Sequence, residues 1–384
     1  MRPRSRTSLV TASLAASLVL ALTAGPLAAP VFAASGGHPA PAACTGTSAP
    51  DTEALSAALA GIPADDVTAA LVRVGGKGAW HGAAGVRDLR TGGPVLERGR
   101  FRAGSVTKLV TASVVLQLVA EGRIALDGTV QEYLPGLLTD DFEPVTVRQL
   151  LTYTSGVQPG AGFGDSTEEM FPHRFETLTP REVVAAAVAK GPGYTPGSRQ
   201  TYGNIHYTVL GLLIEKITGD TYAHQARTRV FGPLGMRGSS FPAGPDPRVR
   251  GPHNRGYEWI SGELVDVTEW NMSDRWAAGD LISTTADLER LLKGVLGGRV
   301  VPPALVREML TVPFDGARYG MALERFTLGG QEIWGKSGSR PGYATGVAAT
   351  PDLCRTVVFS VNSTDARSQG LALAQRFAFP AFTR

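Results

Sequence analysis

The sequence contains few cysteines, a modest net charge and only one long hydrophobic segment. Its 384 residues include two cysteines, so the chain can form at most one internal disulfide. No run of 18 or more apolar residues occurs after Leu22, which argues against a further membrane-spanning helix. The formal charge of +3 is small for this length, and the arginines are dispersed. We therefore expect no nucleic-acid partner and no stable membrane anchor.

Histidine is also scarce, and its spacing does not match that of metal ligands. We expect the histidines after residue 50 to occupy surface or loop positions, with no metal and no other cofactor in the protein. They are His81, His173, His206, His224 and His253.

The beginning of the chain has the pattern of a secretory signal. Basic residues within 2–6 precede the apolar segment 9–22, and small residues around Ala33 suit cleavage. We predict a signal peptide over 1–33 and a flexible lead over 34–50, followed by one secreted domain. An uncleaved membrane anchor is the alternative.

Two cysteines in an exported chain suggest one disulfide, here between Cys44 and Cys354. It would tie the N-terminal tail to the C-terminal sheet. Two separate thiols are the alternative.

Lysine occurs at only six positions, and only Lys108 has a serine three residues before it. Ser105 and Lys108 open an apolar stretch that predicts a helix over 106–120. Residues three apart are neighbours on a helix surface, so the amine can reach the hydroxyl. A lysine or tyrosine that accepts its proton can make a serine nucleophilic without histidine. The alternative is a helix-capping serine beside a solvated lysine.

Two later segments complete a set of three. Among nine tyrosines, only Tyr202 is followed two places later by asparagine, Asn204, ahead of an apolar stretch that predicts a helix over 207–217. The third segment, Lys336-Ser337-Gly338-Ser339, follows a strand-like stretch, and its small residues would let a substrate backbone approach closely. Taken alone, Tyr202 could anchor a loop and Lys336 could be a charged residue at a strand edge. The occurrence of the three segments in this order favours a catalytic site.

Residues 330–337 also match the phosphate-loop string Gly-x4-Gly-Lys-Ser. A phosphate loop requires a helix after it, whose N-terminus receives the phosphate. Here the intervening residues are strand-like, and the Pro/Gly-containing segment 338–342 cannot start a regular helix. We do not expect nucleotide binding.

Hydrophobic periodicity predicts strands near both ends of the chain and mainly helices over about 121–275. This order indicates an α/β protein of the α+β type, in which an antiparallel sheet is flanked by helices and carries an inserted helical subdomain. The three motifs would meet at the junction. The predicted strands are 67–74, 78–86, 318–324, 331–334, 343–349 and 356–362.

The ordered motifs resemble Ser-x-x-Lys, Tyr-x-Asn and Lys-Thr-Gly of the serine penicillin-recognising enzymes. The chain is most similar to the branch with class C β-lactamases and D-alanyl-D-alanine carboxypeptidases, especially the secreted actinomycete carboxypeptidase/transpeptidases. The likeness runs from about Phe101 to Asn362 and implies a β-lactamase/transpeptidase-like fold. It includes Tyr133–Leu138, Val145–Leu151 and Ala278–Thr284.

The resemblance implies a role for each motif residue. Ser105 would be acylated, with Lys108 as its helix neighbour, and Tyr202 would exchange protons with Ser105 and the leaving amine. Asn204 would hold a substrate amide carbonyl. The backbone N–H groups of Ser105 and Ser339 would form the oxyanion hole. A tyrosine serves as a base near neutral pH only when cations lower its pKa, and Lys108 and Lys336 are placed to do so.

The third motif departs from the family pattern. Ser337 replaces threonine and keeps the hydroxyl, and Lys336 stands where the nearest carboxypeptidase relatives carry histidine. For binding a substrate carboxylate, Lys336 with Ser337 is the first candidate. Arg325, before the motif, is the second, with an ordinary exposed arginine as the alternative. Ser337 and Gly338 would contact substrate along the strand.

The resulting expectation is a secreted, monomeric D-alanyl-D-alanine carboxypeptidase that acts on peptidoglycan stem peptides and is inhibited by β-lactams. An esterase, a D-aminopeptidase or a β-lactamase could use the same residues, because leaving-group choice depends on the shape of the cleft. A penicillin-binding sensor that is acylated without turnover is a further alternative.

Overall fold

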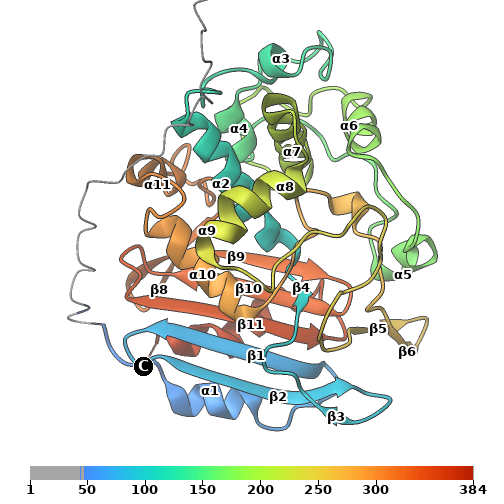
Figure 1. The fold of residues 1–384 in the computed structure, drawn as a ribbon, viewed down its shortest axis with the longest axis vertical. Coiled ribbons are helices and arrows are strands. Elements are labelled where there is room, and N and C mark those ends of the chain that lie inside the picture. The colour runs from blue at the N-terminus through green and yellow to red at the C-terminus, as the bar shows by residue number, and fades with distance from the viewer. Residues whose placement is uncertain (1–43, 45–46, 384) are drawn as a thin grey trace, which may run out of the picture. The chain divides into compact units, whose positions relative to one another are not determined.

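The computed structural model describes residue 44 and residues 47–383, which lie in one compact unit, Ala43–Arg384. A seven-stranded antiparallel sheet runs through it in the order β3-β2-β1-β11-β10-β9-β8, with helices packed against it (Figure 1). The strands are β1 (Val67–Gly76), β2 (Trp80–Asp88), β3 (Gly93–Pro94), β8 (Glu324–Leu328), β9 (Gln331–Arg340), β10 (Tyr343–Ala349) and β11 (Arg355–Ser363). The expected signal peptide and residues 34–43 of the lead lie outside the described residues.

Most helices belong to the chain between the two groups of strands, and in Figure 1 α3, α4, α6 and α7 gather above the sheet. The helices are α1 (Thr52–Leu59), α2 (Thr107–Ala120), α3 (Val130–Tyr133), α4 (Val147–Leu151), α5 (Thr167–Met170), α6 (Pro180–Val188), α7 (Ile205–Thr218), α8 (Tyr222–Ala226), α9 (Gly232–Leu234), α10 (Thr285–Leu296), α11 (Pro303–Met309) and α12 (Gly370–Phe377).

Both faces of the sheet are covered, which explains its nearly continuous apolar strands. Successive strand residues point to opposite faces, and the neighbours Leu71 and Val72 accordingly enter different cores. Leu71 packs in the core shared with α2, α7 and α10, whereas Val72 packs in the core shared with α1 and α12. Every residue of β10 and β11 is buried. The expected fold class is confirmed.

Helix α2 lies at the centre of the molecule and is buried almost all round, so it carries no polar face. The region predicted to be helical also contains a hairpin of β5 (Tyr257–Ile260) and β6 (Glu263–Asp266), which the sequence prediction missed. Its turn has positive φ angles at both Ser261 and Gly262, as a two-residue hairpin turn requires. The Ser-Gly pair was the available signal.

Two strands begin or end at other residues than the sequence predicted. The strand expected over 318–324 begins only at Glu324, because the chain turns just before it, where Ala322 has a φ of 68°. The strand expected to end at Trp334 continues as β9 to Arg340, so the third motif lies inside a strand. The chain continues from this motif into β10, whereas a phosphate loop leads directly into a helix.

Cys44 and Cys354 form a disulfide, so the paired alternative is confirmed. It joins residue 44 to the turn that precedes β11. Within residues 47–383, no helix combines the length and apolar character needed to span a bilayer.

Candidate active site

Ser105 lies on a short helical turn, η1 (Gly104–Val106), between β4 (Phe101–Arg102) and α2. This turn approaches β9 so closely that glycine is required on both sides. A Cβ atom on Gly104, whose φ is +51°, would lie 2.5 Å from the backbone nitrogen of Ser339. One on Gly338 would lie 2.1 Å from the carbonyl oxygen of Ala103. Side chains at either position would push the strand away from the serine.

The Ser105 hydroxyl meets the other two polar groups predicted from the motifs. Lys108 Nζ donates to Ser105 Oγ at 3.1 Å, and Tyr202 Oη donates to the same oxygen at 2.8 Å. The first contact follows from helix spacing, as expected. The second joins α2 to the loop that precedes α7.

Lys108 is fully buried, and its three donors are all used. Besides Ser105, it donates to Asn204 Oδ1 at 2.6 Å and to the Ala278 carbonyl at 2.7 Å. Burial lowers the pKa of Lys108 to about 8, with Lys336 contributing in the same direction. Because Asn204 presents its oxygen to Lys108, its amide N–H group is left to donate to a substrate carbonyl.

Two ammonium groups lie close to the Tyr202 ring. Lys108 Nζ is 5.1 Å and Lys336 Nζ 4.7 Å from the centre of its ring. Burial acts to raise the pKa of Tyr202, but the two cations outweigh it and lower the pKa to about 7. The side chain remains 37% exposed, so it also faces solvent and an incoming substrate. A phenol in this setting can accept a proton near neutral pH.

An aromatic cluster supports Tyr202 from behind and was not anticipated from the sequence. The rings of Tyr153 and Tyr319 lie 5.0 and 5.5 Å from that of Tyr202, and Tyr207 lies 5.4 Å from Tyr153. Tyr207 Oη donates to the Leu151 carbonyl. No local pattern marks these tyrosines as a group, because they come from separated parts of the chain.

His206 corrects the expectation that the histidines occupy surface or loop positions. It is buried on α7, with Nδ1 2.9 Å from Ser155 Oγ and Nε2 3.1 Å from the Thr201 carbonyl. Burial lowers its pKa to about 4, so the ring is neutral at pH 7. His206 therefore holds the backbone immediately before Tyr202. Of the other histidines, His81 and His173 are exposed, and His224 and His253 are partly exposed.

The third motif provides the facing wall. Arg340 pairs with Tyr343 across a two-residue turn, and paired residues along β9 and β10 alternate between bonded and non-bonded. Ser337 and Ser339 therefore turn their N–H groups toward the free edge of β9, since β8 covers only its first half. The Ser105 nitrogen lies across this edge. Two N–H groups can thus receive an oxyanion here.

A cavity of about 250 Å³ opens between these walls. Its polar lining includes Ser105, Tyr202, Lys336, Ser337, Ser339 and Arg367. Arg325 lines neither this cavity nor the one on the other side of Tyr202, and it is exposed on the edge strand β8. The arginine at the cavity is Arg367, which follows β11 and was missed because it lies outside every motif.

The loop that carries Arg367 is held from two elements. Ser339 Oγ donates to the Ala366 carbonyl at 2.8 Å. The Glu258 carboxyl group, on β5, accepts from the Gly342 and Ala366 nitrogens. Burial raises the pKa of Glu258 to about 7. The unpredicted hairpin thereby connects the β9–β10 turn to the loop. Within the described residues, no group of three or more His, Cys, Asp or Glu side chains could hold a metal ion.

The comparisons with known proteins agree with this arrangement. The model of the beta-lactamase family matches residues 63–378. The chain belongs to the beta-lactamase family. It is thus a serine hydrolase of the group that includes β-lactamases and penicillin-binding proteins.

The proteins that are similar to this chain include a penicillin-binding protein, an esterase and an amidohydrolase. Penicillin-binding protein 4 of Amycolatopsis lactamdurans is 33% identical over 229 residues, 57% of each chain. Esterase EstB of Burkholderia gladioli is 34% identical over 202 residues, 49% of this chain and 50% of EstB. The chain therefore spans about half the length of these curated relatives. A D-stereospecific amidohydrolase from a Streptomyces species has 32% identity and a TM-score of 0.74, covering 85% of this chain and 98% of that one.

Proposed function

We propose that the protein is a D-stereospecific serine peptidase, and specifically a D-alanyl-D-alanine carboxypeptidase acting through an acyl-enzyme on Ser105. The observation that carries the proposal is the double contact of Ser105 Oγ with Lys108 and Tyr202 beside a cavity that Arg367 lines. The contacts of Ser105 supply a nucleophile, and Arg367 supplies a cation for a substrate carboxylate.

In the proposed reaction, deprotonated Tyr202 takes the proton of Ser105 as Oγ attacks the carbonyl carbon of the scissile amide. The carbonyl oxygen becomes negative and accepts from the N–H groups of Ser105 and Ser339. The C–N bond then breaks, and Tyr202 returns the proton to the leaving amine. Water hydrolyses the ester by the same proton exchange. Lys108 and Lys336 make the deprotonated form of Tyr202 accessible near pH 7, because their charges lower its pKa to about 7.

The free carboxylate of the terminal D-Ala would meet Arg367, with Lys336 and Ser337 on the strand side of the same cavity. A guanidinium matches a carboxylate with two parallel hydrogen bonds. The exposure of Arg367 leaves its donors open to a ligand. β-Lactams, which carry a carboxylate beside a reactive amide, would acylate Ser105 and act as inhibitors.

A D-amino-acid amidase or an esterase is the second candidate. The similarity to the Streptomyces amidohydrolase over most of both chains, and to EstB, favours it. Such an enzyme would need no cation for a leaving-group carboxylate. A β-lactamase and a non-turnover penicillin sensor are the remaining alternatives.

A matched substrate panel tests the proposal. It comprises an acyl-D-Ala-D-Ala peptide as free acid, its C-terminal amide, a neutral thioester of the same acyl group, a peptide with L-Ala before the scissile bond, and a cephalosporin. We expect preferred cleavage of the free acid, no cleavage after L-Ala, and slow release of the acyl group from the lactam. Preference for the amide or thioester would favour the second candidate, fast lactam turnover a β-lactamase, and acylation without release a sensor.

We also propose that the protein is exported, works as a monomer and meets peptidoglycan stem peptides outside the cell. The Cys44–Cys354 disulfide supports export, because such bonds persist in oxidising compartments. Intact mass of protein recovered from the culture medium tests cleavage after Ala33. Sedimentation of the same material tests the oligomeric state.

A further inference from the structure

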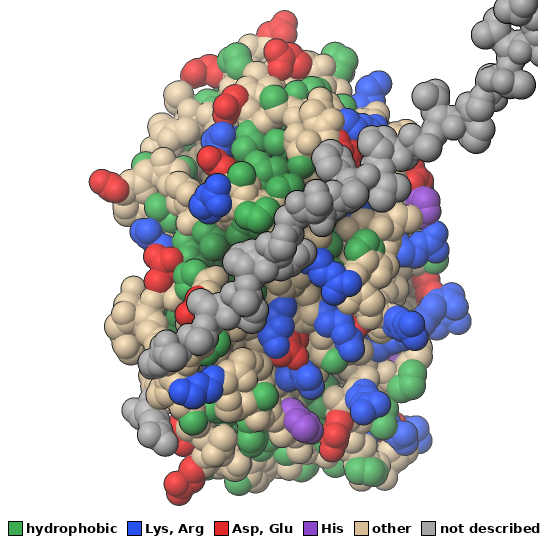
Figure 2. Space-filling view, turned by 60° about the vertical axis from the view of Figure 1, so that its left-hand side comes forward, with side chains coloured by type: hydrophobic (Ala, Val, Ile, Leu, Met, Phe, Trp, Pro, Cys, Tyr) green, Lys and Arg blue, Asp and Glu red, His purple; other side chains and the backbone are tan. Residues whose placement is uncertain are grey.

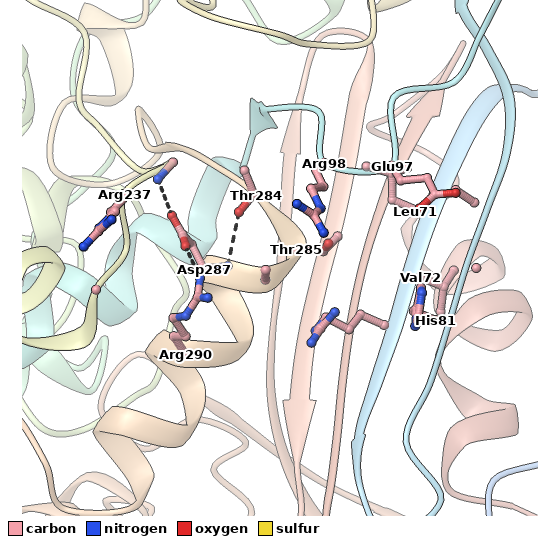
Figure 3. A pocket seen from close by; sticks show the side chains of 16 residues that line it. Leu71, Val72, His81, Glu97, Arg98, Arg237, Thr284, Thr285, Asp287 and Arg290 are labelled. Atoms are coloured by element: carbon pink, nitrogen blue, oxygen red, sulfur yellow. Dashed lines mark hydrogen bonds and ion pairs between the residues drawn. The ribbon is translucent and has the colours of Figure 1, made fainter.

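A cavity larger than the Ser105 cavity lies elsewhere in the molecule. It has a volume of about 850 Å³ and shares no lining residue with the Ser105 cavity. We name it the basic cavity. It lies between the paired strands β1 and β2, the segment carrying Arg98, and the first turn of α10 (Figure 3).

Four arginines line the basic cavity, and their pairing differs. Arg290 is bound to Asp287. Arg73 uses only Nε, which donates to Glu289, so its two terminal nitrogens have no partner within residues 47–383. The side chains of Arg98 and Arg237 are exposed and make no hydrogen bond or ion pair with the described residues. Arg98 and Arg237 therefore offer guanidinium groups that no described residue neutralises, whereas Arg73 is in an ion pair with Glu289 and offers only its two terminal nitrogens.

The arginines also differ in direction. In Figure 3 the Arg98 side chain points toward Thr285 at the start of α10, whereas Arg237 lies on the far side of Asp287 and turns outward. Arg73 pairs across the strands with His81, which lines the same cavity. Arg73 and Arg98 both line the cavity, one from β1 and the other from the segment before β4, which makes these two arginines the candidates for sharing one ligand.

The acidic groups of the cavity do not cancel this charge. Asp287 accepts from the Gly238 nitrogen and Ser239 Oγ as well as from Arg290, so its oxygens are already occupied. Glu97 also lines the cavity, but its carboxylate turns away from Arg98 in Figure 3. Figure 2 shows Lys and Arg side chains gathering at the level of α10 and the sheet.

We propose that the basic cavity binds a phosphate-bearing organic ligand, with Arg73 and Arg98 as its anchors. Arg73 on β1, Arg98 on the segment before β4 and Thr285 at the start of α10 all line the cavity, so donors from three parts of the chain are available to one ligand. A carboxylate presents two oxygens in one plane, which one arginine can satisfy, whereas a phosphate accepts from several directions. The volume lies within the range of organic-ligand pockets and far exceeds that of an inorganic ion. The inference does not depend on the proposed peptidase activity.

Binding is measured by calorimetry with four probes: inorganic phosphate, glycerol 3-phosphate, a short glycerol phosphate oligomer, and citrate. We expect the organic phosphates to bind more tightly than inorganic phosphate and citrate. Tighter binding of the oligomer would identify a phosphodiester chain as the ligand, and tighter binding of glycerol 3-phosphate a free phosphomonoester. Absence of saturable binding by both organic phosphates, or equal binding of citrate, would overturn the proposal.

Arg98→Gln is the decisive variant, because Arg98 is exposed and makes no hydrogen bond or ion pair with the other described residues. It should weaken binding roughly 10- to 150-fold, the effect of one lost charge-assisted hydrogen bond. Arg98→Lys should recover part of the affinity, since lysine keeps the positive charge but lacks the planar guanidinium group that donates two parallel hydrogen bonds. Arg181→Gln, on α6, is the matched control and should bind normally. Equal affinity in Arg98→Gln, or equal loss in Arg181→Gln, would contradict the assignment. Circular dichroism and thermal unfolding of each variant verify that it is folded.

Discussion

The two walls of the Ser105 cavity are built differently. On the α2 side, Ser105, Lys108 and Asn204 are joined by short hydrogen bonds, and Lys108 has no free donor. On the β9 side, Ser337 and Ser339 present open N–H groups, and Arg367 is exposed on a loop. A closed network fixes proton positions, whereas an open edge awaits the hydrogen bonds of a ligand. We infer that the first wall sets the chemistry and the second the specificity, and variants on each side can separate the two.

The largest effect should come from Ser105→Ala. Loss of the nucleophile should reduce hydrolysis on the order of 10⁶-fold, as for nucleophile loss in other serine hydrolases, and remove covalent penicillin labelling. Intact-mass analysis after incubation with penicillin measures this. An adduct on the variant would move the nucleophile to another residue.

Tyr202→Phe should lower the acylation rate by roughly 100-fold or more, because it keeps the ring packing but loses the proton-transfer hydroxyl. Stopped-flow acylation by a chromogenic cephalosporin provides the rate. Near-normal acylation would assign the base role to Lys108 and leave Tyr202 as a packing residue.

Arg367→Gln should separate the walls by substrate. Removing one charge-assisted contact should slow cleavage of the free-acid D-Ala-D-Ala peptide by roughly 10- to 150-fold, while the neutral thioester reacts nearly normally. Arg325→Gln is the matched control, since that exposed arginine lines neither cavity beside Tyr202, and it should change neither rate. Equal losses on both substrates would exclude a selective role for Arg367.

The pH profile tests the electrostatics of Tyr202. In the proposed reaction the deprotonated form of Tyr202 is the base, so kcat/KM for the thioester should rise as pH increases through about 7. Lys336→Met removes a cation that lowers this pKa, so the rising limb should move to higher pH. Measuring kcat/KM from about pH 5 to about pH 9 gives the pH at which the rising limb lies in each protein. Because Tyr202 and the two lysines titrate together, the profile gives apparent pKa values for the whole site. An unmoved limb would show that Lys336 does not tune Tyr202.

The smallest effect concerns stability on the β9 side. The pKa of Glu258 is raised from 4.5 to about 7, so the unfolded state ionises first as pH rises. The stabilisation that protonated Glu258 gives to the folded state should be complete below about pH 4.5. It should fall as pH rises and be lost by about pH 7, which lowers the free energy of unfolding by up to about 3 kcal/mol. Urea unfolding of wild type and Glu258→Gln across this range should show the difference. Parallel pH dependence in the two proteins would refute it.

The sequence predicted the elements whose signals are local. Helix α2 and the Ser105–Lys108 contact follow from spacing along one helix, and the strands of the C-terminal sheet follow from apolar runs. The β5–β6 hairpin was missed because its strands are short and its Ser-Gly turn lies among Pro/Gly-rich loops. Buried His206 was misassigned because a histidine carries no sequence signal of burial without knowledge of its partner Ser155.

The sequence by itself determined the chemical inventory: a serine with a lysine one helical turn away, a tyrosine followed by asparagine, and a glycine-containing strand with a third cation. Only the tertiary structure decided how these groups act on one another. The low pKa of Tyr202 requires both Lys108 and Lys336 close to one ring. The choice of Arg367 over Arg325 depends on strand register and on a loop held by Glu258. Helix spacing is a property of neighbouring residues, whereas desolvation, charge coupling and cavity lining arise between segments that meet only in the folded chain.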